Sequence, residues 1–223
     1  MSYLQDLVTR RRKSQTHASG QSEYKSPLDT NQRELAYLSD LAYKTGSTVK
    51  LRHLAAAGLS DRYSLAAGKS NPNYTILDRS DGKTILALRG TSNFSDVGTD
   101  ALLAIGLEGK TKRFHDTAAV IDRLIAERGR DNLILTGHSL GGSIANSFGK
   151  YYDIESHAYN PGSNLSYARA SIKDKIVDPA YEKKHVIYST ASDPISYLSR
   201  NATDYVYVPP TDINSHSLSN FLI

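Results

Sequence analysis

The chain has 223 residues, which suits one α/β domain, and 39% of them are hydrophobic, which is enough for one sizeable core. It contains no cysteine, so disulfides, a thiolate nucleophile and a cysteine-based metal site are excluded. No apolar run approaches the roughly eighteen residues of a membrane span, and the first residues lack the apolar stretch of a signal peptide. We therefore expect a soluble protein, most simply an intracellular one.

The first 28 residues are polar and basic, with one dense cationic cluster at residues 10–13. The net charge of the whole chain is only +4, so an electrostatic case for nucleic acid would depend on that cluster alone. Short basic runs are usually solvated tails. We predict a flexible arm over residues 1–28, one folded domain over residues 29–223, and no nucleic-acid partner.

The next segments carry a helix signal and then a hairpin signal. Between Thr30 and Lys44, leucines and alanines recur at helical spacing, and Thr30 or Asn31 could cap the first turn. Two β-rich runs follow, joined by Asp81 and Gly82, a pair that permits the positive φ angles of a tight turn. The sequence predicts an amphipathic helix followed by a β-hairpin.

Helical and β-rich patterns then alternate to the end of the chain. A helix is expected over residues 114–128, a second one after residue 141, and strands over residues 132–136, 185–190 and 204–210. Such alternation is typical of an α/β sheet covered by helices.

Residues 137–141 read Gly-His-Ser-Leu-Gly, the G-x-S-x-G spacing, between a β-rich run and a helical pattern. The glycines leave room where the backbone doubles back, and the following helix directs free amides at the serine. A glycine-rich turn of a nucleotide-binding fold is the alternative, but the chain has neither G-x-G-x-x-G nor G-x-x-x-x-G-K. We interpret Ser139 as a nucleophile, with the Leu140 N–H as an oxyanion donor.

A serine nucleophile needs a histidine base, and in α/β-hydrolases the chain order is serine, acid, histidine. His157 follows the nucleophile helix too closely to leave room for an acid loop. His185 begins a strand, at the end away from the catalytic edge if that strand is parallel. His216, after the last strand, is the predicted base, and His138 is interpreted as a packed or hydrogen-bonded structural residue.

Three aspartates could orient this base. Asp193 directly follows a predicted strand, where it can reach the catalytic edge. Asp204 opens the next strand and is expected at its far end, and Asp212 reads as a turn or cap residue. We favour Asp193, with Asp204 and Asp212 as the alternatives.

Several separated segments resemble the class 3 lipases, a family of α/β-hydrolase fold that includes the fungal triacylglycerol lipases. They are "LALRGTSNFSDVGTD", "TGHSLGG", "YNPGSN", "STASDPI" and "DINSHSLSNFLI". With the helical pattern that begins at Leu35, they run in the family's order as far as Ile223. The resemblance implies an α/β-hydrolase fold with a central, mostly parallel sheet and helices on both faces.

The resemblance also implies site residues. Thr91 would supply the second oxyanion donor beside Leu140, and no metal or cofactor is implied. Asp96 and Asp100 would support that loop, with an ion pair to Arg89 as one possibility and helix capping as the equal alternative.

We therefore expect a serine ester hydrolase with Ser139, Asp193 and His216 as its triad, acting on lipid carboxylic esters, with an anionic membrane surface as a candidate partner. The alternatives are an esterase or acyltransferase using small soluble esters, and a non-catalytic lipase-like binding protein. Residues 101–107 form an apolar run that is either a core helix or a lid over Ser139. In the lid hypothesis, nearby cations meet anionic head groups. These cations are Lys110, Lys112 and Arg113.

Overall fold

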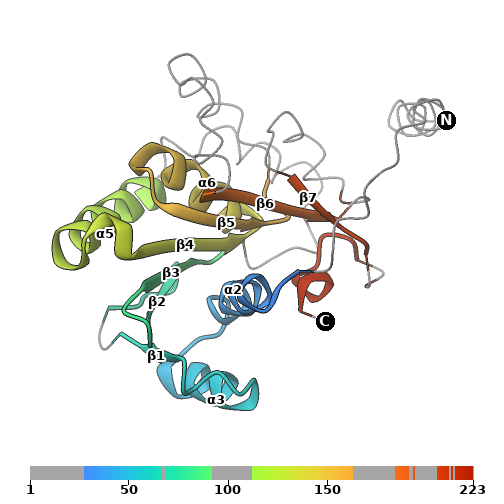
Figure 1. The fold of residues 1–223 in the computed structure, drawn as a ribbon, viewed down its shortest axis with the longest axis horizontal. Helices are drawn as coiled ribbons and strands as arrows, with labels where there is room; N and C mark the ends of the chain where they lie inside the picture. The colour runs from blue at the N-terminus through green and yellow to red at the C-terminus, as the bar shows by residue number, and fades with distance from the viewer. Residues whose placement is uncertain are drawn as a thin grey trace.

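The computed structural model describes residues 28–66, 69–91, 112–162, 184–190, 193, 205–210, 212 and 214–222. In this part of the chain, seven strands form one sheet, with helices packed on both of its faces (Figure 1). The predicted α/β architecture is confirmed. None of the helices within these ranges is long and apolar enough to cross a membrane.

The order of the strands in the sheet follows their order in the chain. The β1–β2 and β2–β3 pairs are antiparallel, and the four pairings from β3 to β7 are parallel. The carboxyl ends of these five parallel strands therefore meet at one edge of the sheet. The strands are β1 (Tyr63–Leu65), β2 (Tyr74–Arg79), β3 (Thr84–Leu88), β4 (Leu133–His138), β5 (Glu155–Tyr159), β6 (His185–Thr190) and β7 (Tyr205–Val208).

Local sequence signals account for the predicted hairpin and the first helix. Gly82 has a φ of 88° in the turn between β2 and β3, as the hairpin prediction required. The predicted cap is wrong, because Asp29 and not Thr30 or Asn31 is the N-cap of the first helix. The Asp29 carboxylate accepts a hydrogen bond from the Gln32 amide at 2.8 Å, and the Gln32 side chain accepts one from the Asp29 amide at 3.0 Å. This reciprocal box satisfies two amides that Thr30 would leave open.

The sequence predicted some of the described elements and missed others. The helix Ser47–Ala56 and the strand β1 were not predicted, because this helix buries only Lys50 and Leu54, and β1 has only three residues. The described helices are α2 (Thr30–Leu41), α3 (Ser47–Ala56), α5 (Lys112–Arg128) and α6 (Leu140–Tyr152), with short 3-10 turns η3 (Arg130–Asn132) and η5 (Leu218–Phe221).

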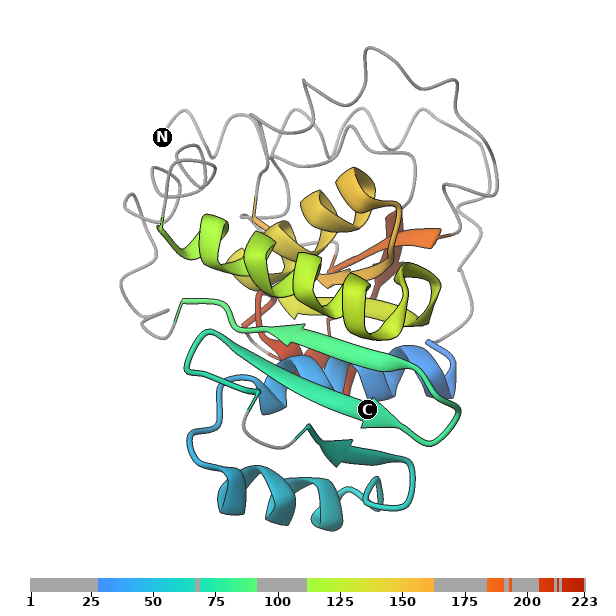
Figure 2. The ribbon, with the colours of Figure 1, turned by 90° about the vertical axis from the view of Figure 1, so that its left-hand side faces the viewer.

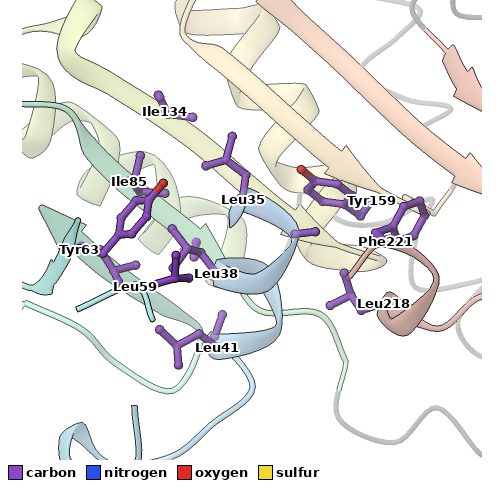
Figure 3. Packing of buried hydrophobic residues seen from close by; sticks show 14 of the residues in the cluster. Leu35, Leu38, Leu41, Leu59, Tyr63, Ile85, Ile134, Tyr159, Leu218 and Phe221 are labelled. Carbon is purple, nitrogen blue, oxygen red and sulfur yellow. The ribbon is translucent and has the colours of Figure 1, made fainter. Parts of the chain in front are cut away.

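Side chains alternate between the two faces of the sheet, so neighbouring residues of one strand join different cores. Ile85 and Ile134 pack with the α2 leucines Leu35, Leu38 and Leu41 on one face (Figure 3). On the other face, the core is shared with α5 and α6, which lie across the sheet from α2 (Figures 1 and 2). Its main members are Ile76, Leu86, Leu135, Ile121, Leu124, Ile144 and Phe148. The described helices thus cover both faces of the sheet and do not cover the edge formed by the carboxyl ends of its parallel strands.

Candidate active site

Ser139 occupies the sharp turn between β4 and α6. Its φ of 56° and ψ of −126° lie in a region that costs a non-glycine residue about 1–3 kcal/mol. The turn is held from behind, since the Ser139 amide donates to the Tyr159 carbonyl of β5 at 3.0 Å. Leu140 is the first residue of α6, so its N–H is one of the four that have no acceptor inside the helix. The fold therefore sets a strained serine at the amino end of a helix.

The glycines around Ser139 are required by close packing. A Cβ atom on Gly137 would overlap the Gly141 carbonyl, and one on Gly141 would overlap the Leu88 carbonyl at the end of β3. Neither glycine has a positive φ, so the constraint is space and not backbone conformation. This is the steric reason that the sequence analysis gave for the motif.

The structure brings Asp193 and His216 together. The Asp193 Oδ1 atom lies 3.0 Å from the His216 Nδ1 atom, and the two residues are 0% and 6% exposed. Asp193 follows β6 by three residues, and His216 lies in the turns after β7. A carboxylate buried against one imidazole nitrogen fixes the tautomer and leaves Nε2 to act as a base.

The competing aspartates do not occupy this position within the described residues. The Asp212 carboxylate accepts a hydrogen bond from the Asn214 amide at 3.0 Å and another from the Ser219 hydroxyl. It is therefore a turn residue, as its spacing suggested. Asp204 lies outside the described residues.

The segment that carries His216 is anchored by residues that the sequence analysis did not single out. The Asn160 Nδ2 group donates to the Ser215 carbonyl at 2.9 Å, and the Thr190 hydroxyl donates to the same carbonyl. Asn160 also accepts a hydrogen bond from the Thr190 amide at 2.9 Å, and its φ is 40°. An asparagine directly after a buried strand and before Pro161 was the available signal, since asparagine tolerates this conformation.

His138 is buried between two polar groups. Its Nε2 atom lies 2.7 Å from the His216 carbonyl oxygen, and its Nδ1 atom lies 3.0 Å from the Tyr43 hydroxyl. Burial, reinforced by the nearby His216 imidazole, lowers the pKa of His138 to about 3, so the ring is neutral at neutral pH. The interpretation of His138 as a hydrogen-bonded residue is confirmed.

Thr91 lies three residues beyond Leu88, the last residue of β3, and is exposed. The preceding Gly90 is close to the nucleophile turn, since a Cβ atom there would lie 2.8 Å from the His138 carbonyl oxygen. The expected oxyanion segment and Ser139 are therefore neighbours at the carboxyl edge. Asp96, Asp100, residues 101–107 and Lys110 lie outside the described residues, so the loop supports and the lid stay predictions.

Two of the cations assigned to head groups in the lid hypothesis begin α5. Lys112 is strongly exposed and pairs with Asp116 at 2.6 Å. The Arg113 guanidinium donates to the Arg89 carbonyl, which ties the start of α5 to the end of β3. Their contact with lipid stays a prediction.

The other two histidines that follow Ser139 in the chain make side-chain contacts elsewhere in the sheet. His185 begins β6 and its Nδ1 atom lies 3.1 Å from the Ser156 hydroxyl; β6 is parallel to β5, so His185 lies at the amino end of the strands, as predicted. His157 lies between Tyr188 and Glu155, at 2.9 Å from each. No group of three or more acidic residues and histidines within the described ranges could hold a metal ion.

Comparison with known proteins places this geometry in a family. No curated protein matches the sequence. Among solved structures, a mutant form of MDLA from Penicillium cyclopium matches with a TM-score of 0.50, 15% identity and 86% of each chain covered. Lipase II from Rhizopus niveus matches with a TM-score of 0.45 and 12% identity over 85% of this chain and 84% of that one. The first of these supports the α/β-hydrolase fold.

A family model described as a phospholipase-like, Tle-like phospholipase domain matches residues 34–187, more than half of the chain. The expected lipase-like membership is thereby confirmed at the level of the family. The matched segment contains the strained serine and its flanking glycines. The chain belongs to the family of Tle-like phospholipase domains, which places it among the lipid ester hydrolases.

Proposed function

We propose that this protein is a serine hydrolase that cleaves carboxylic esters of phospholipids through an acyl-enzyme intermediate. The observation that carries the proposal is the buried 3.0 Å hydrogen bond between Asp193 and His216, beside a serine strained at the amino end of α6. Together these residues supply a nucleophile, a base and an orienting acid.

In the first step, Ser139 Oγ attacks the ester carbonyl carbon while His216 Nε2 takes the hydroxyl proton. The Asp193 carboxylate accepts the hydrogen bond from Nδ1 and stabilises the imidazolium that forms. The carbonyl oxygen becomes an oxyanion, which the backbone N–H groups of Leu140 and Thr91 bind. The amino end of α6 adds a partial positive charge near that oxygen.

Collapse of this intermediate breaks the bond to the alcohol oxygen, which receives the proton from His216. The acyl group is now esterified to Ser139. Water then attacks the acyl-enzyme, with His216 as the base, and the fatty acid leaves with regeneration of the serine hydroxyl. Every proton transferred passes through His216, so the reaction needs no further acid or base.

Covalent labelling with a fluorophosphonate probe tests the mechanism without requiring the natural substrate. We expect the wild type to be labelled and Ser139→Ala to be unlabelled. Ser147→Ala is the matched control, because Ser147 is also buried in α6 and its hydroxyl donates to the Ser143 carbonyl at 2.7 Å. Folded wild type that takes up no label contradicts the proposal.

The family description supports phospholipid as the substrate class. Fatty acid release should be compared on phosphatidylglycerol vesicles, phosphatidylcholine vesicles and a triolein emulsion. We expect faster release from the two phospholipids. Equal or faster release from triolein, with Ser139 labelled, contradicts the phospholipid assignment and leaves the serine mechanism standing.

A further inference from the structure

Three parts of the proposed catalytic machinery meet at the side chains of Tyr43 and His138. His138 precedes the nucleophile and contacts the His216 carbonyl. Tyr43, just after α2, reaches the other imidazole nitrogen of His138. A Cβ atom on Gly90, the residue before Thr91, would overlap the Tyr43 hydroxyl. Oxyanion segment, nucleophile turn and base are therefore joined by two side chains.

We propose that Tyr43 and His138 are positioning residues. They hold the base His216 and the oxyanion segment, Gly90 and Thr91, in the orientation that catalysis at Ser139 requires. The proposal rests on the proposed function, because it assigns these residues to that same site. Neither of them reacts with the substrate. Their role is to set where the His216 ring and the Thr91 amide stand relative to the serine.

The chemistry of the groups fixes the direction of the hydrogen bonds. A carbonyl oxygen can only accept, so His138 Nε2 must carry the hydrogen that is donated to His216. A neutral imidazole has one N–H, which makes Nδ1 an acceptor for the Tyr43 hydroxyl. The chain therefore runs from Tyr43 through His138 to the His216 carbonyl, and the low pKa of His138 keeps it from reversing at neutral pH.

The base requires such an anchor because no strand holds it. Asp193 fixes the His216 ring through Nδ1, and the Asn214 side chain accepts the His216 amide hydrogen at 3.1 Å. The carbonyl group is the third point, held by His138 at 2.7 Å. The two imidazole rings also lie 4.9 Å apart between centroids. Loss of the third point removes one of the contacts that set the position of the ring.

The charge state of His138 matters for the same reason. His216, Tyr43 and Asp193 are the titratable groups that act on it. Removal of a proton from Ser139 makes His216 a cation, and a second cation within the same pocket would oppose that step. A neutral histidine donates a hydrogen bond to the base without adding this repulsion. Lysine or arginine could also donate, but each would bring a positive charge.

The sheet contains a matched pair that does not contact the proposed site. The Tyr188 hydroxyl lies 2.9 Å from His157 Nδ1, and both of these residues are buried, whereas in the other pair His138 is buried and Tyr43 is partly buried. Neither Tyr188 nor His157 hydrogen-bonds through its side chain to Ser139, Asp193 or His216 among the described residues. Tyr188→Phe therefore removes the same chemical group from the same kind of pair and is the control for Tyr43→Phe.

The kinetic test uses a p-nitrophenyl acyl ester and the full chain. We expect Tyr43→Phe to lower kcat roughly ten- to a hundredfold with KM changed less than about twofold, because small misplacements act on the transition state. His138→Leu should lose more, and His138→Gln should recover part of the loss, since its amide can still donate to the His216 carbonyl. Tyr188→Phe should keep the wild-type kcat. Equal losses in both phenylalanine variants overturn the proposal.

A second readout separates this proposal from the mechanism itself. Histidine ring resonances should be followed by NMR in ring-labelled protein. We expect Tyr43→Phe to shift the signals of His138 and His216, and Tyr188→Phe to shift those of His157 while leaving His216 unmoved. An unmoved His216 signal in Tyr43→Phe overturns the positioning role whatever the activity, whereas wild type that a fluorophosphonate does not label overturns the proposed function alone.

Discussion

The two ends of the parallel strands hold the same residue types and differ in what those residues can do. Each end has a serine, a histidine and an aspartate drawn from neighbouring strands and their connections. The carboxyl-end set is Ser139, Asp193 and His216, and the amino-end set is Ser156, Asp153 and His185. Residue identity alone therefore does not separate a candidate hydrolase site from a structural cluster.

At the amino end, the serine is locked into the core. Ser156 is fully buried in β5, and its hydroxyl lies 3.1 Å from the His185 Nδ1 atom. The Asp153 carboxylate is 4.0 Å from His185 Nε2 and is shared with Lys184 at 3.4 Å. A Cβ atom on Gly149 would overlap the Ser156 hydroxyl, so α6 closes over it. No ester could reach this serine.

Helix α6 makes the second difference, because it begins at one site and ends at the other. Its amino end presents free N–H groups beside Ser139, which stabilise a negative charge. Its carboxyl end presents carbonyl groups near Asp153, the C-cap residue, and would destabilise an oxyanion there. In the proposed function, strand end and helix polarity account for the chemistry assigned to the carboxyl-end serine, histidine and aspartate.

The largest effect that separates the two ends is loss of the serine hydroxyl. Ser139→Ala should reduce kcat on p-nitrophenyl esters by roughly 10⁴-fold or more, while the fold is kept. Ser156→Ala should leave kcat within about twofold and lower stability by about 1 kcal/mol, the usual scale for one hydrogen bond. Steady-state kinetics and urea titration measure both. Substantial activity in purified Ser139→Ala would refute the mechanism.

Neutralising the aspartate should follow in size. Asp193→Asn is expected to lower kcat by about 10³- to 10⁴-fold, because the amide no longer stabilises the imidazolium or enforces its tautomer. Asp153→Asn, at the other end, should change kcat little. If Asp212→Asn proves the severe variant, the assignment of the acid is wrong.

The pH dependence of stability tests the low pKa of His138, the buried histidine at the carboxyl end of the strands. The unfolded chain binds a proton at position 138 below its ordinary pKa of 6.5, and the folded chain does so only near 3. The free energy of unfolding therefore falls as pH drops through this interval, by about 2 kcal/mol between pH 6.5 and 4.5 from this group. His138→Gln cannot titrate, so its stability curve should be flatter over that range. Parallel curves from urea titrations would contradict the low pKa.

The smallest effects concern the glycines that seat α6 at its two ends. Gly141→Ala pushes against the Leu88 backbone and should cost about 2 kcal/mol together with activity, since the nucleophile turn must shift. Gly149→Ala meets mainly the Ser156 side chain and should lower stability without a selective loss of kcat. Melting temperature and kcat, measured on both variants, distinguish the outcomes. Equal activity losses would mean that α6 moves as one body.

The features that the sequence predicted well are those with strong local signals. Two β-rich runs and the Asp81-Gly82 turn predicted β2 and β3, and the G-x-S-x-G spacing between a strand and a helix predicted the turn at Ser139. Chain order and strand polarity were enough to select Asp193 over Asp212 for the position beside His216. These inferences depend on geometry that holds for any parallel sheet.

What the sequence did not predict depends on contacts between distant segments. Tyr43 and Asn160 act across gaps in the chain that no periodicity reveals, Tyr43 through His138 and Asn160 through Ser215. Helix α3 buries only two side chains, so its apolar pattern is weak. The cap at Asp29 is an exception, since Asp29 and Gln32 stand at the local three-residue spacing of a capping box.

Strand β7 is the outermost strand at its side of the described sheet, and it pairs with β6 alone. Outer strands detach at a lower free energy than central ones, so local opening should begin there before global unfolding. The segment that follows β7 carries His216, and detachment would withdraw the base from a serine still seated on the central strand β4. On gradual heating, catalysis would then cease while most of the helical circular dichroism signal remains.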